Sequence, residues 1–410
     1  MNVASFIARR VAFNRQKSFS RFIIRLATLA TTISVASMII SSSFVNGFQE
    51  AISEKIYNFW GHIRVQQFEP RKALVAEETP LQQNALVDTI LSHTDNIKQF
   101  QAFATKSAVI EYHKDIEGIL IKGVDEQYNF SNLERFLVKG RWLHFDDDRY
   151  AREIVLSSPV ATELNIHIGD TVSVYFIATA GAQAEMRKLT VVGLYKTGIE
   201  EYDKLFALSD IRLIRRVNHW DNNEIGGYEV FLNNPTQMEA TADELFHTLP
   251  DTWMAKTIQE VYPNIFDWLN IQDVNKQVIY IIMAIVAVIN LITCLLILVL
   301  ERTPMTGILK SLGSSNWVIQ KIFLYHSSLI AFRGVILGLL LGLGVSWLQQ
   351  STGLLKLDES AYYIREAPVR IHFSQVALIC TGTFVVCYLA LLIPTFFVKK
   401  IQPVRAIKFN

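Results

Sequence analysis

Residues 278–300 read VIYIIMAIVAVINLITCLLILVL, an apolar run without a charged side chain. Comparable runs occupy Leu26–Phe48, Phe323–Leu348 and Val376–Val398, and a charge interrupts only one of them, at Arg333. Because an α-helix rises about 1.5 Å per residue, about 20 residues cross the ~30 Å hydrocarbon core of a bilayer. The sequence therefore predicts four transmembrane helices.

The predicted fold is an integral α-helical membrane protein with a large extracytoplasmic α+β domain between its first two membrane helices. We expect a cytoplasmic basic tail at 1–21, a cytoplasmic loop at 301–322, a short outer loop at 350–375 and a second basic tail at 399–410. The expected transmembrane helices are 22–48, 276–300, 323–349 and 376–398. The α+β domain is expected at 49–275.

Charge sets the predicted orientation. The N-terminal segment carries six arginine or lysine residues and no acid before Leu26, and the C-terminal tail after Val398 carries four and no acid. Basic flanks face the cytoplasm, which places both termini inside and residues 49–275 in the periplasm of an inner-membrane protein. This block holds 34 acidic and 21 basic residues. A cleaved signal peptide is disfavoured, because the first apolar run is too long and no Ala-x-Ala site follows it.

The polar block mixes strand-like and helix-like patterns. Alternation predicts strands at 63–68, 118–122, 171–176, 189–193 and 228–232, and proline or polar caps predict helices at 80–91, 158–164, 209–217 and 235–249. All three cysteines (Cys294, Cys380 and Cys387) lie in predicted membrane helices, so the domain must be stabilised by its own apolar core.

A long hairpin tip is expected between two of these strands. Its small apolar side chains either grip a hydrophobic partner or form an unstructured extension. The candidate residues are Ile177, Ala178, Thr179, Ala180, Gly181, Ala182 and Met186.

The third membrane helix contains a row of glycines. Gly334, Gly338 and Gly342 recur every four residues, which puts them on one stripe and favours close helix packing over ligand contact. Arg333 is either a functional intramembrane charge or the edge of a span that begins deeper in the chain.

The loop between the second and third spans predicts one short helix, because Pro304 suits a first turn and Gly313 suits the residue beyond a helix end. Met305, Ile308, Leu309 and Leu312 would share one face of it. This stripe either docks a partner or lies flat on the bilayer.

Several functions are disfavoured by missing motifs. The sequence holds no Walker loop, no H-E-x-x-H, no G-x-S-x-G and no C-x-x-C, and its nine histidines lack metal-ligand spacing. We expect no catalysis, no metal and no cofactor in this chain, so an energy source would belong to another subunit.

Residues 301–313, ERTPMTGILKSLG, resemble the E-R-x-x-x-x-G-I-L-(K/R)-x-L-G loop of FtsX-like ABC permeases. The resemblance narrows to Lol-type lipoprotein-releasing permeases, the LolC/LolE branch. The supporting segments are Asn46–Gln49, Gly61–Ile63, Gly198–Asp203, Pro263–Leu269, and Leu357–Tyr363 before Pro368-Val369.

This resemblance implies a permease subunit of a mechanotransmission transporter. It would pair with a second permease, the same or a sister chain, above two copies of a cytoplasmic ATPase that uses ATP. A lipoprotein would enter a cavity from the outer leaflet and pass to a periplasmic carrier, with residues 177–187 at the position of a carrier-binding hook. The residues implied in ATPase coupling are Glu301, Arg302, Met305, Gly307, Ile308, Leu309, Lys310, Leu312 and Gly313. Met305-Thr306 replaces an acidic-aliphatic pair, so these contacts are expected to be apolar.

The candidate cavity residues lie in the outer halves of the first two spans, where they face either acyl chains or membrane lipid and neighbouring helices. They are Ile40, Phe44, Val45, Phe48, Val278, Ile282 and Met283. Two alternatives to lipoprotein release stay open: a related permease that exports another lipid or a peptide, and a signalling permease that activates an envelope hydrolase.

Overall fold

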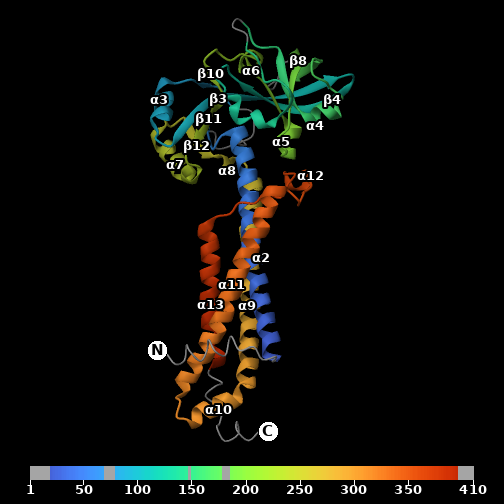
Figure 1. Ribbon diagram of the computed structural model, residues 1–410. Helices are drawn as coiled ribbons and strands as arrows, with labels where there is room; N and C mark the ends of the chain where they lie inside the picture. The colour runs from blue at the N-terminus through green and yellow to red at the C-terminus, as the bar shows by residue number, and fades with distance from the viewer. Residues whose placement is uncertain (1–18, 69–78, 146–148, 178–184, 396–410) are drawn as a thin grey trace. The chain divides into compact units, whose positions relative to one another are not determined.

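The computed structural model describes residues 19–68, 79–145, 149–177 and 185–395. They divide into two compact units. The helical unit comprises the described residues within 1–50, 268–356 and 366–410, and the polar domain comprises those within 51–267 together with 357–365. Figure 1 labels many of the elements of the two units.

The described residues contain four helices that are long and apolar enough to cross a membrane, and the described part of each predicted span lies on one of them. These helices are α2 (Phe19–Trp60), α9 (Pro263–Glu301), α11 (Asn316–Thr352) and α13 (Phe373–Thr395). The predicted fold class is confirmed. The helices outrun the apolar stretches: α2 continues for twelve residues past Phe48, and α9 begins fifteen residues before Val278.

The glycine row of α11 lies against α2. A Cβ atom added at Gly338 would stand 2.7 Å from the Cβ of Val35, and one at Gly342 would stand 3.0 Å from the Cβ of Ile39. At Gly334 the nearest atom would be the Cβ of Thr31, at 2.6 Å. Residues 31, 35 and 39 recur every four positions, as the glycines do, so a ridge of α2 fills a groove in α11.

We predict that Gly338→Ala destabilises the full-length chain in detergent by about 1–3 kcal/mol, because the added methyl group has no room beside Val35. Gly344→Ala is the matched control, since a Cβ there meets nothing within 4 Å. Thermal unfolding of both variants tests this expectation. Equal melting temperatures would contradict the close contact.

The polar domain contains one ten-stranded sheet and one two-stranded sheet. The strands of the large sheet are β1 (Ile63–Gln67), β3 (Ile97–Tyr112), β4 (Asp115–Val124), β5 (Leu137–Gly140), β6 (Glu153–Ser157), β7 (Thr171–Phe176), β8 (Glu185–Tyr195), β9 (Phe206–Asp210), β11 (Gly227–Leu232) and β12 (Trp253–Thr257). The small sheet pairs β2 (Leu81–Gln82) with β10 (Glu224–Ile225). The α-helices are α3 (Ala85–His93), α4 (Ser158–Glu163), α5 (Glu200–Leu205), α6 (Ile211–Asn218), α7 (Met238–Thr248), α8 (Ile258–Val261) and α12 (Glu359–Tyr362).

The long strand β3 divides the large sheet into two parts. Its first half pairs with β11, which continues through β1 to β12. Its second half pairs with both β4 and β7, and the pairings β4–β9, β9–β6, β6–β8 and β8–β7 close a ring. Both parts share one apolar cluster, which includes Val65 from β1 and Val191 from β8.

The predicted strand at 171–176 matches β7, whereas the helix predicted at 80–91 begins too early. Leu81 and Gln82 form β2. Helix α3 starts at Ala85, because the side chain of Asn84 accepts a hydrogen bond from the amide of Leu86 and caps the helix.

A buried ion pair lies beneath the last turn of α2. Lys122 Nζ is 2.6 Å from Glu229 Oε1, and both side chains are fully buried. The same ammonium donates to the carbonyl oxygen of Phe59 at 2.5 Å and lies 4.4 Å from the Trp60 ring. Burial lowers the pKa of Lys122, and the carboxylate of Glu229 opposes that shift. These contacts hold the end of α2 in the core of the polar domain.

His62 makes the stability of the polar domain depend on pH. Its ring stacks on Tyr57 with centroids 4.6 Å apart, and its Nδ1 accepts the amide of Leu232 at 3.2 Å. Burial lowers the pKa of His62 from 6.5 to about 4. The unfolded state therefore takes up the proton first as the pH falls, so His62 favours folding above pH 6.5 and that advantage is lost between pH 6.5 and 4.

We predict that acidification through this window removes about 3 kcal/mol of stability through His62. Replacement by phenylalanine removes the titrating ring, so His62→Phe should flatten the dependence of unfolding free energy on pH. Denaturant unfolding of the full-length chain at several pH values provides the measurement. An unchanged slope in the variant would contradict this role.

Candidate functional sites

The predicted short helix between α9 and α11 is α10 (Thr303–Ser311). Pro304 lies in its first turn, where a missing amide hydrogen costs nothing. Gly313 adopts the left-handed conformation with φ +87, and the amide of Ser314 donates to the carbonyl of Leu309 at 2.9 Å beyond the helix end. Pro304 and Gly313 thus lie at the start and just beyond the end of α10, as predicted.

The apolar stripe of α10 divides between two environments. Met305 and Leu309 pack against the core of the helical unit, and Gly307 is buried. Ile308 and Leu312 remain 54% and 77% exposed.

The charged residues implied in ATPase coupling differ in exposure. Glu301 is exposed, while Arg302 and Lys310 are half-buried. Trp317, at the start of α11, is a further exposed apolar side chain that the sequence analysis did not single out. Trp317 lies on the next helix, beyond a turn, so a search for one apolar stripe along α10 does not include it.

The seven cavity candidates do not share one surface. Val45 and Phe48 are buried, and Phe48 packs edge-on against Trp268 with centroids 5.4 Å apart. Ile40, Phe44 and Met283 are half-buried, whereas Val278 and Ile282 are about half exposed. The exposed pair belongs to a longer apolar row along α9, which consists of Ile271, Val274, Val278, Ile281, Ile282, Ile285 and Ile289.

Arg333 is exposed in the middle of the continuous helix α11, seventeen residues after Asn316. In the predicted hairpin, β7 and β8 pair from Thr171–Thr190 to Phe176–Glu185, and both Ile177 and Met186 are exposed. The candidate residues Ala178, Thr179, Ala180, Gly181 and Ala182 lie outside the described residues.

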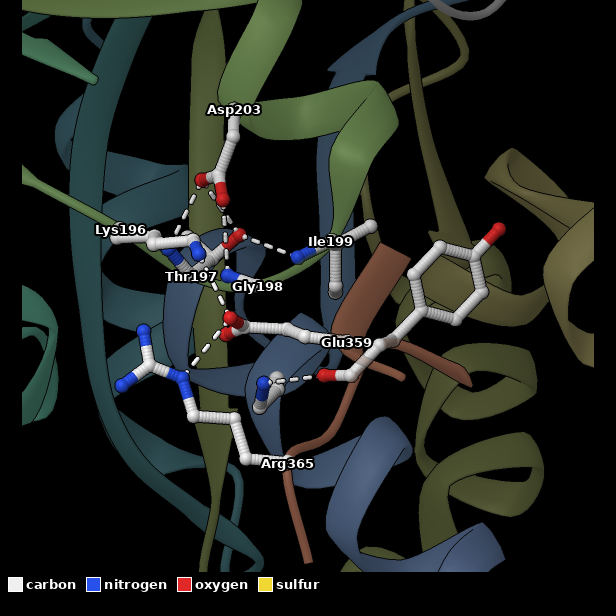
Figure 2. Close-up of polar contacts among 9 residues, drawn as sticks. Lys196, Thr197, Gly198, Ile199, Asp203, Glu359 and Arg365 are labelled. Atoms are coloured by element: carbon white, nitrogen blue, oxygen red, sulfur yellow. Dashed lines mark hydrogen bonds and ion pairs between the residues drawn. The ribbon is translucent and has the colours of Figure 1, made fainter. Parts of the chain in front are cut away.

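Two segments that carried the family resemblance meet in the polar domain (Figure 2). We call residues 357–365, between α11 and α13, the strap. Glu359 of the strap accepts hydrogen bonds from Lys196 at 2.7 Å and from Arg365 at 2.9 Å. The carbonyl of Tyr363 accepts from Lys55 at 2.6 Å. The strap, although it connects two membrane helices, therefore packs as part of the polar domain.

Asp203 holds the turn at Thr197 and Gly198, on which the strap packs. Its carboxylate accepts the amides of Thr197 at 2.8 Å and Gly198 at 2.9 Å, and also the Thr197 hydroxyl at 2.8 Å. Burial raises the pKa of Asp203, and these hydrogen bonds oppose that shift. At Glu359 burial also acts upward, but the bonds from Lys196 and Arg365 prevail and lower its pKa.

Gly198 is required where the strap docks. It adopts φ +78, and a Cβ there would stand 2.7 Å from Lys55 Nζ and 2.9 Å from Glu359 Oε1. A side chain would therefore strain the backbone and press on two of the groups that hold the strap. Sequence reasoning singled out both segments, but nothing in their spacing could reveal that they touch.

We predict that Gly198→Ala loosens the strap and raises hydrogen exchange of residues 357–365 in the full-length chain. Gly169→Ala is the matched control, because Gly169 also adopts a positive φ of +94 but has nothing within 4 Å of a Cβ. The control should carry the backbone strain without exposing the strap. Equal exchange in the two variants would refute the steric role of Gly198.

Among the residues that the structure describes, no three His, Cys, Asp or Glu side chains gather closely enough to hold a metal ion.

Comparison with known proteins places the chain in a family. A MacB-like periplasmic core domain matches residues 26–246, and an FtsX-like permease C-terminal domain matches residues 277–403. The lipoprotein-releasing system transmembrane protein LolC of Neisseria meningitidis is 23% identical over 98% of both chains. LolE of Haemophilus influenzae is 22% identical over 99% of both. LolC of Xylella fastidiosa is 22% identical over 98% of this chain and 97% of its own. The chain therefore belongs to the family of the MacB-like periplasmic core domain. It is a multi-pass membrane protein whose C-terminal part matches the FtsX-like permease domain, and it is similar over nearly its whole length to LolC and LolE.

Proposed function

We propose that this chain is the permease subunit of a transporter that extracts lipoproteins from the outer leaflet of the inner membrane. A separate ATPase drives it from the cytoplasm, where both termini lie, and a second permease, the same or a sister chain, completes the membrane part. The released lipoprotein passes to a periplasmic carrier. The names of the LolC and LolE relatives, which match nearly the whole chain, support this assignment.

The observation that carries the proposal is the divided stripe of α10. Ile308 and Leu312 offer exposed apolar surface on a helix whose Met305 and Leu309 are seated in the core of the helical unit. A partner bound to the first pair would act on the bundle through the second. An interfacial helix would share the exposed pair, so the experiment below must separate partner binding from membrane contact.

Continuous helices support mechanical transmission. Helix α2 extends without a break into the polar domain, where Phe59 and Trp60 lie in an aromatic cluster with Tyr202 and Phe206. Helix α9 is continuous from Pro263 to Glu301. In this proposal, such continuous helices carry a displacement at the level of α10 to the residues beyond the bilayer.

The free-energy cost of extracting a lipoprotein from the membrane requires an energy source such as the ATPase. Extracting an acyl chain from the bilayer costs about 0.8 kcal/mol per CH₂ group, which is tens of kcal/mol for the three chains of a triacylated lipoprotein. The cost falls if the chains move into another apolar site. The exposed row on α9, with Val278 and Ile282, and the half-buried Phe44 on α2 are the candidate surfaces for them.

We predict that Ile308→Asp and Leu312→Asp each lower co-purification of the ATPase about tenfold or more, because burial of such a side chain contributes about 1.5–3 kcal/mol. Ser311→Asp places the same charge on an exposed position of the same helix and serves as control. Leu309→Asp is a poorer probe, because Leu309 also packs in the core. Full ATPase recovery with both variants would assign α10 to the bilayer surface.

Depletion of the protein in cells tests the assignment itself. Outer-membrane lipoproteins should then accumulate in the inner membrane and return to the outer membrane when the protein is restored. Normal lipoprotein sorting would overturn the proposal. Recovery of a cell-wall hydrolase without any lipoprotein in pull-downs would favour the signalling alternative.

A further inference from the structure

A cationic cavity lies beside the strap and is not used by the proposed transport step. Its volume is about 400 Å³, and α2, the segment 135–138, the turn after β8 and the strap line it. Four of its lining side chains are basic (Lys55, Arg135, Lys196 and Arg365), and two are acidic (Glu54 and Glu359).

The acidic groups do not balance the basic ones. Glu359 is shared between Lys196 and Arg365, at 2.7 and 2.9 Å. Arg135 lies 3.2 Å from Glu54, and Lys55 donates to a neutral carbonyl, that of Tyr363, at 2.6 Å. The nearby carboxylate of Asp203 is buried and turned to the amides of Thr197 and Gly198. The lining therefore has an excess of two positive charges, which favours an anionic ligand.

The α2 residues that line the cavity follow closely after the apolar run of the same helix. Ala51, Glu54 and Lys55 line it from one face of α2, and Lys55 is seven residues past Phe48, where the apolar run ends. At about 1.5 Å per residue this separation is about 10 Å along the helix. The headgroup layer of a bilayer is about 5–8 Å deep on each side, and long basic side chains extend toward it. A phospholipid headgroup is therefore within reach.

The lining favours a lipid over a free ion. Arginine side chains bind phosphate oxygens through paired N–H groups, and Arg135 and Arg365 are 44% and 72% exposed and so can turn to a ligand. Val138 is an exposed apolar side chain in the same lining. Val138 would contact the glycerol or the upper acyl carbons of a lipid, whereas it would make no favourable contact with an inorganic ion.

We propose that this cavity binds the phosphate of an anionic phospholipid headgroup from the surrounding leaflet. The ligand would bridge α2 and the strap, because both elements supply its cations. This inference is independent of the cargo, so a failure of the transport assignment would leave it standing.

Native mass spectrometry of the full-length chain from mixed micelles tests the proposal. The wild type should retain phosphatidylglycerol in preference to phosphatidylcholine. Arg135→Gln/Arg365→Gln should reduce that retention about tenfold or more, because each basic residue near a membrane surface contributes about 1 kcal/mol to binding of an anionic lipid. Arg152→Gln/Lys188→Gln removes two exposed charges of the same domain outside the cavity and should retain the lipid.

Two further arms decide the ligand source. Arg135→Lys/Arg365→Lys keeps the charge and should restore part of the lipid binding, which a folding defect would not allow. A titration with inorganic phosphate, followed by thermal unfolding, should leave the wild type unchanged. Equal retention of phosphatidylglycerol by wild type and the glutamine variant would overturn the proposal. So would stabilisation by free phosphate that depends on the two arginines while phosphatidylglycerol is not retained.

Discussion

The close approach of α11 to α2 is the contact on which the rest of the helical unit depends. Three glycines leave a groove that Thr31, Val35 and Ile39 fill, so the two helices cannot slide past each other without a clash. Helix α11 follows α10 in the chain, and α2 ends in the core of the polar domain at Trp60. In the proposed transport cycle, a force applied at α10 would pass through this contact to the helix that enters the polar domain.

The polar domain holds the end of α2 through fixed contacts. Trp60 lies against Phe206 with ring centroids 4.9 Å apart, and Lys122 of the buried Lys122–Glu229 pair lies 4.4 Å from the Trp60 ring, so the end of α2 cannot rotate freely. Separating the two residues of a buried ion pair would leave an uncompensated charge in the core, so this core resists rearrangement. The strap, which is the segment between α11 and α13, is held separately through Glu359 and Tyr363. Within the polar domain, both the end of α2 and the strap are therefore held in place by side-chain contacts.

The apolar runs were enough to predict the membrane helices, because few structures other than a helix can cross a bilayer. Pro304 and Gly313 were enough to predict α10, because each acts locally, at one end of the helix. The glycine stripe was visible as a spacing, but its partner on α2 was not. Strand β3 escaped prediction because both of its faces are covered, so buried residues follow one another without alternation, and Lys106 is buried among them. The strap cluster joins residues more than 160 positions apart, such as Lys196 and Glu359, and no local pattern could reveal it.

The most direct test of the account is release of a triacylated lipoprotein from liposomes that contain the full-length chain and its ATPase, with a soluble acceptor outside. The account predicts release that requires both proteins and stops when the ATPase carries an inactivated hydrolysis site. Release by the isolated chain without the ATPase would contradict it, as would full ATP hydrolysis by the complex with no lipoprotein leaving the membrane.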